Sequence, residues 1–422
     1  MSPRSILHLD ADAFYASVEQ AADSRLRGRA IAVGGTSRGI IASASYEARA
    51  KGVRTPMPTT QALRLCPNLT IVPGDFEKYE RFSQLLFAYA YDLTPEVEIC
   101  SIDEGYLDLS KQREGHPRES ALHLAKAVRD NLKITISQGL ATNKFCSAVA
   151  SKLKKPAHFL EVPPGQERSF LANLPVRWLP GIGTKTEPRY LEAGISLIEQ
   201  VATLPISELE KLAGSAAHDL HLFAQGIDSR LVTPTAPAPK SFGEQETFST
   251  NQTDEVFCLA TLRSMVDRLC RKLRGEGFAA RTLSLRIRYQ DMEDEMRSDS
   301  LHEPSPLEND FYPLLQPLLR KSWSQAKPLR LVGVRLTNLH HALPEPELPL
   351  TGLPQKSLTE RLQLAEATDQ VRKQFGSDAI LRGHDLWLQK KLLAQEGGRD
   401  SQANPSQEQT SNHTRSEVDP SQ

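Results

Sequence analysis

The start of the chain combines a short apolar run with a segment of helical periodicity. Residues 5–10, SILHLD, form a run that ends in an acid and predicts a buried strand. Residues 13–23 place Phe14 and Val18 on one helical face, and Asp12 stands where it would cap this helix. The pattern predicts a strand that leads directly into an amphipathic helix.

Two more strands and a short helix follow. Residues 31–35, IAVGG, and residues 39–44, GIIASA, have the composition of strands. Residues 46–51, YEARAK, predict a short helix with Ser45 as its N-cap and Gly52 at its C-terminal end. These elements form a small, strand-rich segment after the first helix.

The next segments predict the rest of an α+β unit. Residues 78–92 and 118–131 have helical periodicity, and between them VEICSIDEGYLDLS at 97–110 alternates like two strands that meet near its middle. Residues 133–142 predict another strand and residues 143–153 another helix. The order of these elements predicts an antiparallel sheet with helices on one face.

The chain then changes character. Residues 168–230 predict helices interrupted by Pro and Gly, and TPTAPAPK at 233–240 predicts an extended linker. Helical patterns at 254–274 and about 308–325 are each followed by a strand pattern, which predicts a second, smaller α+β unit. One more helical pattern lies at 358–375. Beyond about residue 395, the Gln-, Ser- and Asn-rich sequence predicts disorder.

Composition narrows the class of protein. Hydrophobic residues make up 39% of the chain, as in globular proteins. No apolar run reaches the ~18 residues of a membrane span, and the N-terminus lacks the apolar stretch of a signal peptide. We therefore expect a cytoplasmic protein. The five cysteines are scattered without a CxxC pair, which favours reduced thiols over disulfides or a zinc site.

The net charge is only −1, but basic residues are concentrated in one stretch. Between residues 263 and 288, eight basic residues stand against two acids. Such a run is usually a solvated face, so alone it indicates a nucleic-acid partner only weakly. The eight are Arg263, Arg268, Arg271, Lys272, Arg274, Arg281, Arg286 and Arg288.

Three acids, Asp10, Asp103 and Glu104, stand at predicted strand ends. Neighbouring side chains of a strand point to opposite faces, so Asp103 and Glu104 meet only if the backbone turns, and Gly105 favours such a turn. Singly, each acid would be interpreted as a cap or a surface charge. Together they repel one another unless cations neutralise them, and Mg²⁺ prefers oxygen ligands. The group therefore predicts a site for two magnesium ions.

Four sequence blocks form a specific combination. They are HLDADAFYASVE at 8–19, SYEARAKGV at 45–53, SIDEGYLDLS at 101–110 and GLATNKF…ASKLKKP at 139–156. Together they resemble the successive motifs of the Y-family of translesion DNA polymerases. The similarity in order and spacing extends throughout 1–345 and is nearest to the bacterial DNA polymerase IV branch.

The resemblance implies a multidomain α+β right-hand polymerase with a ferredoxin-like palm, small fingers, a helical thumb with a helix-hairpin-helix, and an α+β little finger. The implied activity is template-directed addition of deoxynucleotides to a primer 3′ end, with low fidelity and bypass of damaged bases in DNA repair. We expect a monomer. The expected domains are the palm at 1–11 and 78–167, fingers at 12–77, thumb at 168–232, linker at 233–242, little finger at 243–342, and a partly disordered tail at 343–422.

The resemblance also assigns catalytic roles to the three acids. It implies that Asp10 and Asp103 hold the two Mg²⁺ ions, and that the backbone carbonyl of Ala11 is a further ligand. It implies that Glu104 ligates the ion on the primer side and assists the 3′ hydroxyl. Whether Glu104 accepts a proton or acts only as a ligand is left open.

Residues for the incoming nucleotide are implied in the same way. Tyr46 and Arg49 are three apart on the short helix and share a face; an isolated pair of this kind would be a surface contact. The resemblance assigns both to the triphosphate, where Arg offers charge-assisted hydrogen bonds. Lys155 is assigned there too, although the residues alone do not separate it from Lys154.

An aromatic pair opens the first helix. Phe14 fits the core face of this helix. Tyr15 matches the family's steric gate, a ring that occupies the space of a ribose 2′-hydroxyl. Because a clash of this kind is a repulsive element, it can discriminate strongly against ribonucleotides.

Contacts to DNA are expected from both halves of the chain. LPGIGTKT at 179–186 resembles a helix-hairpin-helix, whose backbone N–H groups suit a phosphate. Pro188 departs from the pattern, but it falls in the first turn of the next helix, where Pro is tolerated. The stretch KSFGEQETF at 240–248 and the basic run match the little finger. The expected DNA-binding residues are Gly181, Gly183, Lys185, Lys240, Arg281, Arg286 and Arg288.

A sliding clamp is an expected partner, because the weak net charge predicts few additions per encounter. The candidate clamp-binding peptide, QKSLT at 355–359, lacks the family's terminal aromatic.

The sequence leaves two alternatives to an active polymerase. An inactive family member acting as a scaffold in a mutagenesis complex would lack the acids, whereas all three are present. A nucleotide cyclase would explain the acids and magnesium, but not the thumb hairpin, the linker or the basic second unit.

Overall fold

The computed structural model describes residues 3–35, 38–112, 116–235, 237–324, 327–341 and 358–400. The chain divides into two compact units, Met1–Pro237 and Ala238–Gln422. The boundary lies in the Pro-rich stretch of the sequence. Across the described ranges, every helix is too short or too polar to cross a membrane.

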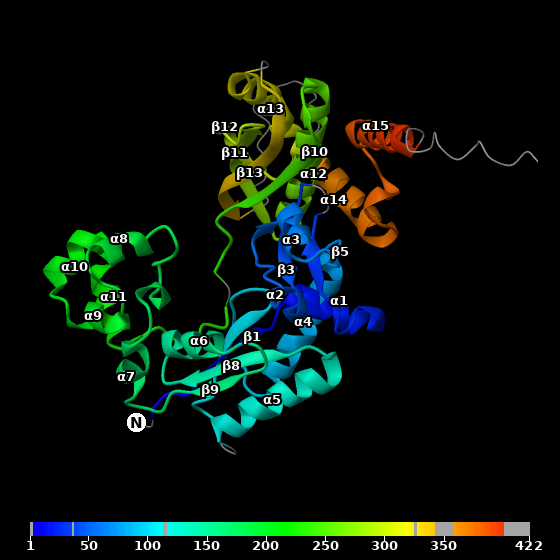
Figure 1. Cartoon of the computed structure of the whole chain (residues 1–422). Helices are drawn as coiled ribbons and strands as arrows, with labels where there is room; N and C mark the ends of the chain where they lie inside the picture. Colours follow the sequence, from blue (N-terminus) through cyan, green and yellow to red (C-terminus); the bar gives the residue numbers. More distant parts are fainter. Residues whose placement is uncertain are drawn as a thin grey trace, which may run out of the picture. The chain divides into compact units, whose positions relative to one another are not determined.

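A five-stranded sheet with the order β6-β7-β1-β8-β9 organises the first unit. All neighbours are antiparallel except β8 and β9, which are parallel. Helices cover both faces (Figure 1). These elements are β1 (Ile6–Ala11), β6 (Val97–Ile99), β7 (Glu104–Asp108), β8 (Ile136–Ala141), β9 (Phe159–Glu161), α4 (Phe76–Tyr91), α5 (Pro117–Leu132) and α6 (Lys144–Leu153).

Strand β1 is buried along its whole length because both faces are covered. Leu7 and Leu9 join the core formed with α4 and α5. His8 points to the opposite face, where its Nδ1 lies 2.8 Å from the Ser151 Oγ of α6. The prediction of helices on one face was therefore wrong. Because His8 is a polar residue, the sequence predicts that its face of the strand is exposed, whereas in the structure this face is buried.

A smaller sheet with the order β4-β3-β2-β5 follows the first helix. As predicted, Ser45 caps the short helix α2, accepting a hydrogen bond from the Ala48 N–H. Asp12 does not cap α1, because its buried carboxylate accepts hydrogen bonds from β8 and the segment after α6 instead. The elements are α1 (Phe14–Ala22), β2 (Ile31–Gly34), β3 (Ile40–Ala44), α2 (Tyr46–Arg49), β4 (Met57–Pro58), α3 (Thr59–Leu65) and β5 (Thr70–Val72).

The last part of the first unit is helical, as predicted. Its apolar side chains form a core that also includes residues of α6. Pro188 lies in the first turn of its helix, which survives. The helices are α7 (Glu167–Ala172), α8 (Glu187–Glu192), α9 (Ile198–Thr203), α10 (Ile206–Ala213) and α11 (Ala217–Ala224).

The second unit is a four-stranded antiparallel sheet in the order β10-β13-β11-β12, with helices on one face. In β11, Leu283 and Leu285 face the helices, while Arg286 and Arg288 alternate with them. The sequence did not predict β12, since its residues are exposed on both sides at the sheet edge. The elements are β10 (Phe242–Gln252), α12 (Glu255–Gly275), β11 (Phe278–Tyr289), β12 (Asp294–Ser305), α13 (Glu308–Ser322) and β13 (Leu329–His341).

Two C-terminal helices belong to this second unit. Helix α14 (Leu358–Phe375) coincides with the predicted helical pattern. Helix α15 (Gly383–Asp400) was not predicted, and it continues past residue 395, where disorder was expected. It packs along α12 (Figure 1), which stabilises a helix that composition alone does not indicate. Residues 401–422 and most of the peptide 355–359 lie outside the described residues.

Candidate active site

Strands β1 and β7 bring the predicted acids to one end of the large sheet. Asp10 and Glu104 are directly opposite one another in the antiparallel register, so their side chains share a face. Asp103 immediately precedes β7, and its carbonyl accepts a hydrogen bond of 2.9 Å from the Ala11 N–H. The pairing of two strands thus places Asp10 and Glu104, which are 94 positions apart in sequence, beside each other.

A serine makes the turn that positions Asp103. The Ser101 Oγ accepts hydrogen bonds from the N–H groups of Asp103 and Glu104, at 3.3 and 3.1 Å, and donates one of 2.5 Å to Asp103 Oδ1. Gly105, which was expected to allow the turn, lies inside β7. A Cβ there would be 2.9 Å from the Phe87 ring, so the glycine permits close packing instead.

Two lysines lie on the acids. The Lys155 ammonium contacts the Asp10 carboxylate and is 3.9 Å from Asp12 Oδ1. The Lys152 Nζ lies 2.9 Å from Glu104 Oε2. Burial raises the pKa of Asp10, and the neighbouring Lys155 charge opposes this rise. Positive charge is therefore concentrated where the sequence predicts metal ions.

The donor set suits divalent cations. In the described residues, Asp10, Asp103 and Glu104 do not form a group whose ligand atoms all lie within 4.8 Å. Two ions ~3.5–4 Å apart do not require so tight a group. The side chains offer carboxylate oxygens, as Mg²⁺ prefers, and the ammonium groups of Lys155 and Lys152 stand in for cations on Asp10 and Glu104.

Of the residues expected at the triphosphate, Tyr46 and Lys155 lie beside acids of the site, and Arg49 packs on Tyr46. The Arg49 guanidinium lies over the Tyr46 ring, 4.8 Å from its centroid, and its Nε donates to the Ala44 carbonyl. The Tyr46 hydroxyl is 3.5 Å from Asp12 Oδ1, the same oxygen that Lys155 approaches. Burial, then the charge of Asp12, raises the pKa of Tyr46 to about 12. Tyr46 and Lys155 thus converge on one buried acid.

The aromatic pair of α1 divides as predicted, with Phe14 in the core. Tyr15 is half-buried and stacks on Tyr79, with ring centroids 4.4 Å apart, while Phe76 packs edge-on at 6.0 Å. Burial and the charge of Asp103 raise the pKa of Tyr15. The expected gate is therefore held by aromatic packing and lies within electrostatic reach of the acids.

The hairpin of the thumb region is a surface loop. Gly181, Gly183 and Lys185 are exposed, and Ile182 between them is buried. Gly181 adopts a φ of +82°, which favours glycine. The N–H of Glu187 bonds to the Gly183 carbonyl. A buried isoleucine thus anchors a loop that presents its backbone to solvent.

In the second unit, three of the four side chains that are predicted to contact DNA already have partners within the chain. Arg286 and Arg288 both pair with Asp294 of β12, at 2.8 and 2.7 Å. Arg281 donates to the Leu301 carbonyl, and Lys240 is exposed. These four side chains lie on the sheet strands or just before them.

The other half of the basic run serves packing. Arg274 is largely buried and pairs with Glu308 and with Asp369 of α14, both at 2.8 Å. Arg268 pairs with Glu244 at 2.6 Å. The run is therefore not a single solvated face, because α12 directs its basic side chains toward other elements.

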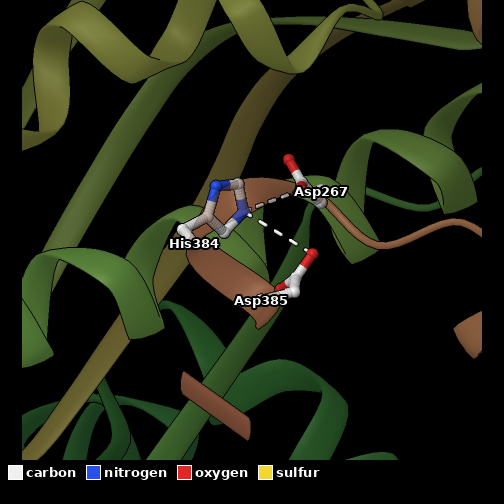
Figure 2. Close-up of side chains that lie close together, drawn as sticks. All are labelled: Asp267, His384 and Asp385. Atoms are coloured by element: carbon white, nitrogen blue, oxygen red, sulfur yellow. Dashed lines mark hydrogen bonds and ion pairs between the residues drawn. The ribbon is translucent and has the colours of Figure 1, made fainter. Parts of the chain in front are cut away.

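A separate cluster lies between α12 and α15. Asp267, His384 and Asp385 are the one trio in the described residues whose possible ligand atoms all lie within 4.8 Å (Figure 2). The His384 Nε2 is 2.9 Å from Asp267 Oδ2, but the Arg382 Nε lies 3.3 Å from that same oxygen. Tyr312 donates to the other Asp267 oxygen. A guanidinium so close opposes a cation, and we interpret the trio as part of an ion-pair network.

Several residues at the site were not predicted. The sequence does not distinguish Lys152 from its neighbours in KLKK, and it predicts Ser101 as part of a strand. For Tyr79 the sequence predicts only a helical position. For Lys152 the available signal is its place in the same basic segment as Lys155, three positions earlier.

Two sequence profiles of the impB/mucB/samB family match the chain, the family itself at residues 9–152 and its C-terminal domain at 239–348. The DNA polymerase IV of Opitutus terrae is 41% identical over 386 residues, which cover 90% of this chain and 97% of that protein. The DNA polymerase IV of Dehalococcoides mccartyi is 32% identical over 393 residues, which cover 92% of this chain and 99% of that protein.

Solved structures give the same match. A Y-family DNA polymerase chimera of Dbh and Dpo4 superposes with a TM-score of 0.71 at 25% identity, over 79% of this chain and 98% of that chain. The insertion ternary complex of Dbh DNA polymerase gives a TM-score of 0.56 at 26% identity, with the same coverage. The class defined by fold and site is the Y-family of translesion DNA polymerases. The chain belongs to this family, the impB/mucB/samB family, and its curated relatives are DNA polymerase IV enzymes.

Proposed function

We propose that the chain extends a primer 3′ end on a DNA template, adding deoxynucleotides with low fidelity and past damaged bases. The observation that carries the proposal is the register of β1 and β7, which sets Asp10 opposite Glu104 with Asp103 at the adjoining turn. Acids at one sheet edge with stand-in ammonium groups suit magnesium-dependent phosphoryl transfer.

The residues at the sheet edge would hold two Mg²⁺ ions. Asp10, Asp103 and the Ala11 carbonyl are the proposed ligands, with Glu104 on the primer side. When bound, the ions supply charge stabilisation for the attacking 3′ oxygen and for the leaving pyrophosphate. The chain's own part is to fix the carboxylates through strand pairing and through the Ser101 hydroxyl.

The nucleotide would bind between the acids and α2. We propose that Tyr46, Arg49 and Lys155 donate to the triphosphate, so that Lys155 exchanges a carboxylate partner for a phosphate. Tyr15 would close the sugar side of the pocket, supported by its stacking on Tyr79.

DNA would be held through its backbone, which makes the affinity salt-dependent and independent of sequence. The proposed domains are the palm, fingers and thumb in the first unit and the little finger in the second. The thumb hairpin and the arginines of β11 are the proposed contacts. A sliding clamp is the proposed partner, and a pull-down with wild type and with the variant Gln355→Ala, Leu358→Ala in the candidate peptide tests it without removing the C-terminal helices.

Primer extension on undamaged and damaged templates tests the activity. We expect wild type to extend both, and Asp103→Ala to lose about a thousandfold or more, because metal ligation supplies several kcal/mol of transition-state stabilisation. Asp92→Ala removes an exposed acid at the end of α4 and should leave the rate unchanged. Wild-type protein that extends no primer would support the inactive-scaffold alternative.

A further inference from the structure

One charged group at the site has no role in the proposed chemistry. The Lys152 Nζ lies 2.9 Å from Glu104 Oε2, and its side chain is 39% exposed. Lys155, its counterpart on Asp10, is already assigned to the nucleotide. The question is what an ammonium does on the acid that is proposed to ligate the primer-side ion.

The backbone places Lys152 over Glu104. A Cβ at Gly139 would be 2.0 Å from the Ser147 carbonyl oxygen of α6, so only glycine lets this helix approach β8 so closely. On the neighbouring strand, the His8 Nδ1 lies 2.8 Å from the Ser151 Oγ. Lys152 follows Ser151 directly, so the helix that is clamped to the sheet carries the ammonium to the acid.

The pair has a definite electrostatic consequence. The lone pairs of Glu104 Oε2 that accept from an ammonium are the ones that a cation would use. A positive charge near a cation site repels the cation, and this repulsion weakens binding. The Lys152 side chain also has room to leave, because it is partly exposed.

We propose that Lys152 competes with divalent cations for Glu104. Its ammonium neutralises the carboxylate while no ion is bound and gives way when an ion binds. Lys152 thereby raises the ion concentration at which the site fills, and it keeps the acid charge-compensated until then. This inference rests on the proposed function, because it takes Glu104 to be a metal ligand.

A titration of the full chain with Mn²⁺, without DNA, tests the inference. The electron paramagnetic resonance signal of free Mn²⁺ measures how much of the ion is bound. Lys152→Met should fill the site at about two- to fivefold lower Mn²⁺, the range expected for loss of one half-exposed charge pair. Lys152→Arg keeps the charge and should match wild type. Lys154→Met removes an exposed lysine two positions along and should change the binding less than twofold.

The outcomes separate this inference from the proposed function. Unchanged or weaker Mn²⁺ binding by Lys152→Met would overturn the competition. Asp103→Ala should abolish the Mn²⁺ binding on which Lys152→Met acts; if it binds as wild type does, the proposed metal site is wrong. As a second readout, Lys152→Met should lower the Mg²⁺ concentration for half-maximal primer extension and leave the KM for the deoxynucleotide unchanged.

Discussion

At the scale of single residues, the steric gate depends on a second ring. Tyr15 stacks on Tyr79, whose hydroxyl donates a hydrogen bond of 2.8 Å to Glu19. We predict that Tyr15→Ala raises the efficiency of ribonucleotide incorporation relative to deoxynucleotide by tenfold or more, since the clash is removed. Tyr79→Leu should have a smaller effect in the same direction.

The ratio of kcat/KM for deoxy- and ribonucleotides measures this effect. Tyr91→Ala is the matched control, because Tyr91 is an exposed tyrosine of α4, the helix that also carries Tyr79. A Tyr15→Ala enzyme that still excludes ribonucleotides as wild type does would remove Tyr15 from this role.

His8 gives the first unit a pH dependence. Burial, reinforced by nearby lysine charges, lowers the pKa of His8 from 6.5 to about 3. The folded chain therefore keeps this ring neutral, while the unfolded chain binds a proton below pH 6.5. Its contribution to stability is full above pH 6.5 and falls as the pH drops toward 3, by up to about 1.4 kcal/mol per pH unit.

Urea unfolding at pH 7 and pH 5 in EDTA measures this slope. Trp178 is the only tryptophan of residues 1–237, so its fluorescence reports on this unit when Trp323 and Trp387 are replaced by Phe. His8→Gln should reduce the loss of stability between the two pH values. The exposed His123 is the control, and His123→Gln should keep the wild-type slope. Equal slopes in all three proteins would contradict a neutral, buried His8.

At the scale of elements, the C-terminal helices are integral to the second unit. Arg274 of α12 is 8% exposed and joins Glu308 of α13 to Asp369 of α14. We predict that Arg274→Ala costs about 2–3 kcal/mol of unfolding free energy, because a buried charged hydrogen-bond donor is lost, while Glu308 keeps Arg382 and Asp369 keeps the more distant Arg271. Arg320→Ala breaks an exposed pair with Glu255 and should cost less than about 1 kcal/mol.

Hydrogen exchange of the α12 amides measures the predicted loss of stability. If α14 and α15 are released, the α12 amides lose protection and exchange faster. If Arg274→Ala and Arg320→Ala leave the exchange of α12 equally slow, the buried network does not hold the helices.

The elements also show what sequence can and cannot predict. Strands with one apolar face and helices with clear periodicity were found close to their true bounds, as in β1 and α12. Strand β12 was missed because an edge strand exposed on both sides has no apolar alternation. Helix α15 was missed because docking on α12 stabilises it.

The same limit applies at the site. The motifs identified Asp10, Asp103 and Glu104, and strand pairing brings them to one edge. The sequence predicts that Asp12 caps α1, because the nearest hydrogen-bond donors along the chain are the N–H groups of this helix. The donors that it uses, on Thr135, Ser137 and Ala157, are more than a hundred positions away and come together only through the fold.

At the scale of the whole molecule, ion pairs within the chain limit how many basic side chains are free to contact DNA. The net charge is −1, and Asp294 occupies both Arg286 and Arg288. These arginines also hold the pKa of Asp294 well below its usual range. We predict that Asp294→Asn tightens binding to primer-template about two- to fivefold at low salt, because the freed arginines reach phosphates.

Fluorescence anisotropy across a salt series measures this change. Asp299→Asn is matched in charge and lies on the same exposed strand β12, so it reports the effect of net charge alone. If the two variants bind DNA equally, Asp294 does not restrain the arginines.

The central claim is that Asp10, Asp103 and Glu104 hold divalent ions at one edge of the large sheet. Anomalous scattering from Mn²⁺ in crystals of the chain with primer-template and a non-hydrolysable deoxynucleotide tests it most directly. We predict anomalous peaks within bonding distance of these carboxylates, with the Lys152 ammonium displaced from Glu104. Peaks only elsewhere, for example at Asp267, His384 and Asp385, would contradict the account.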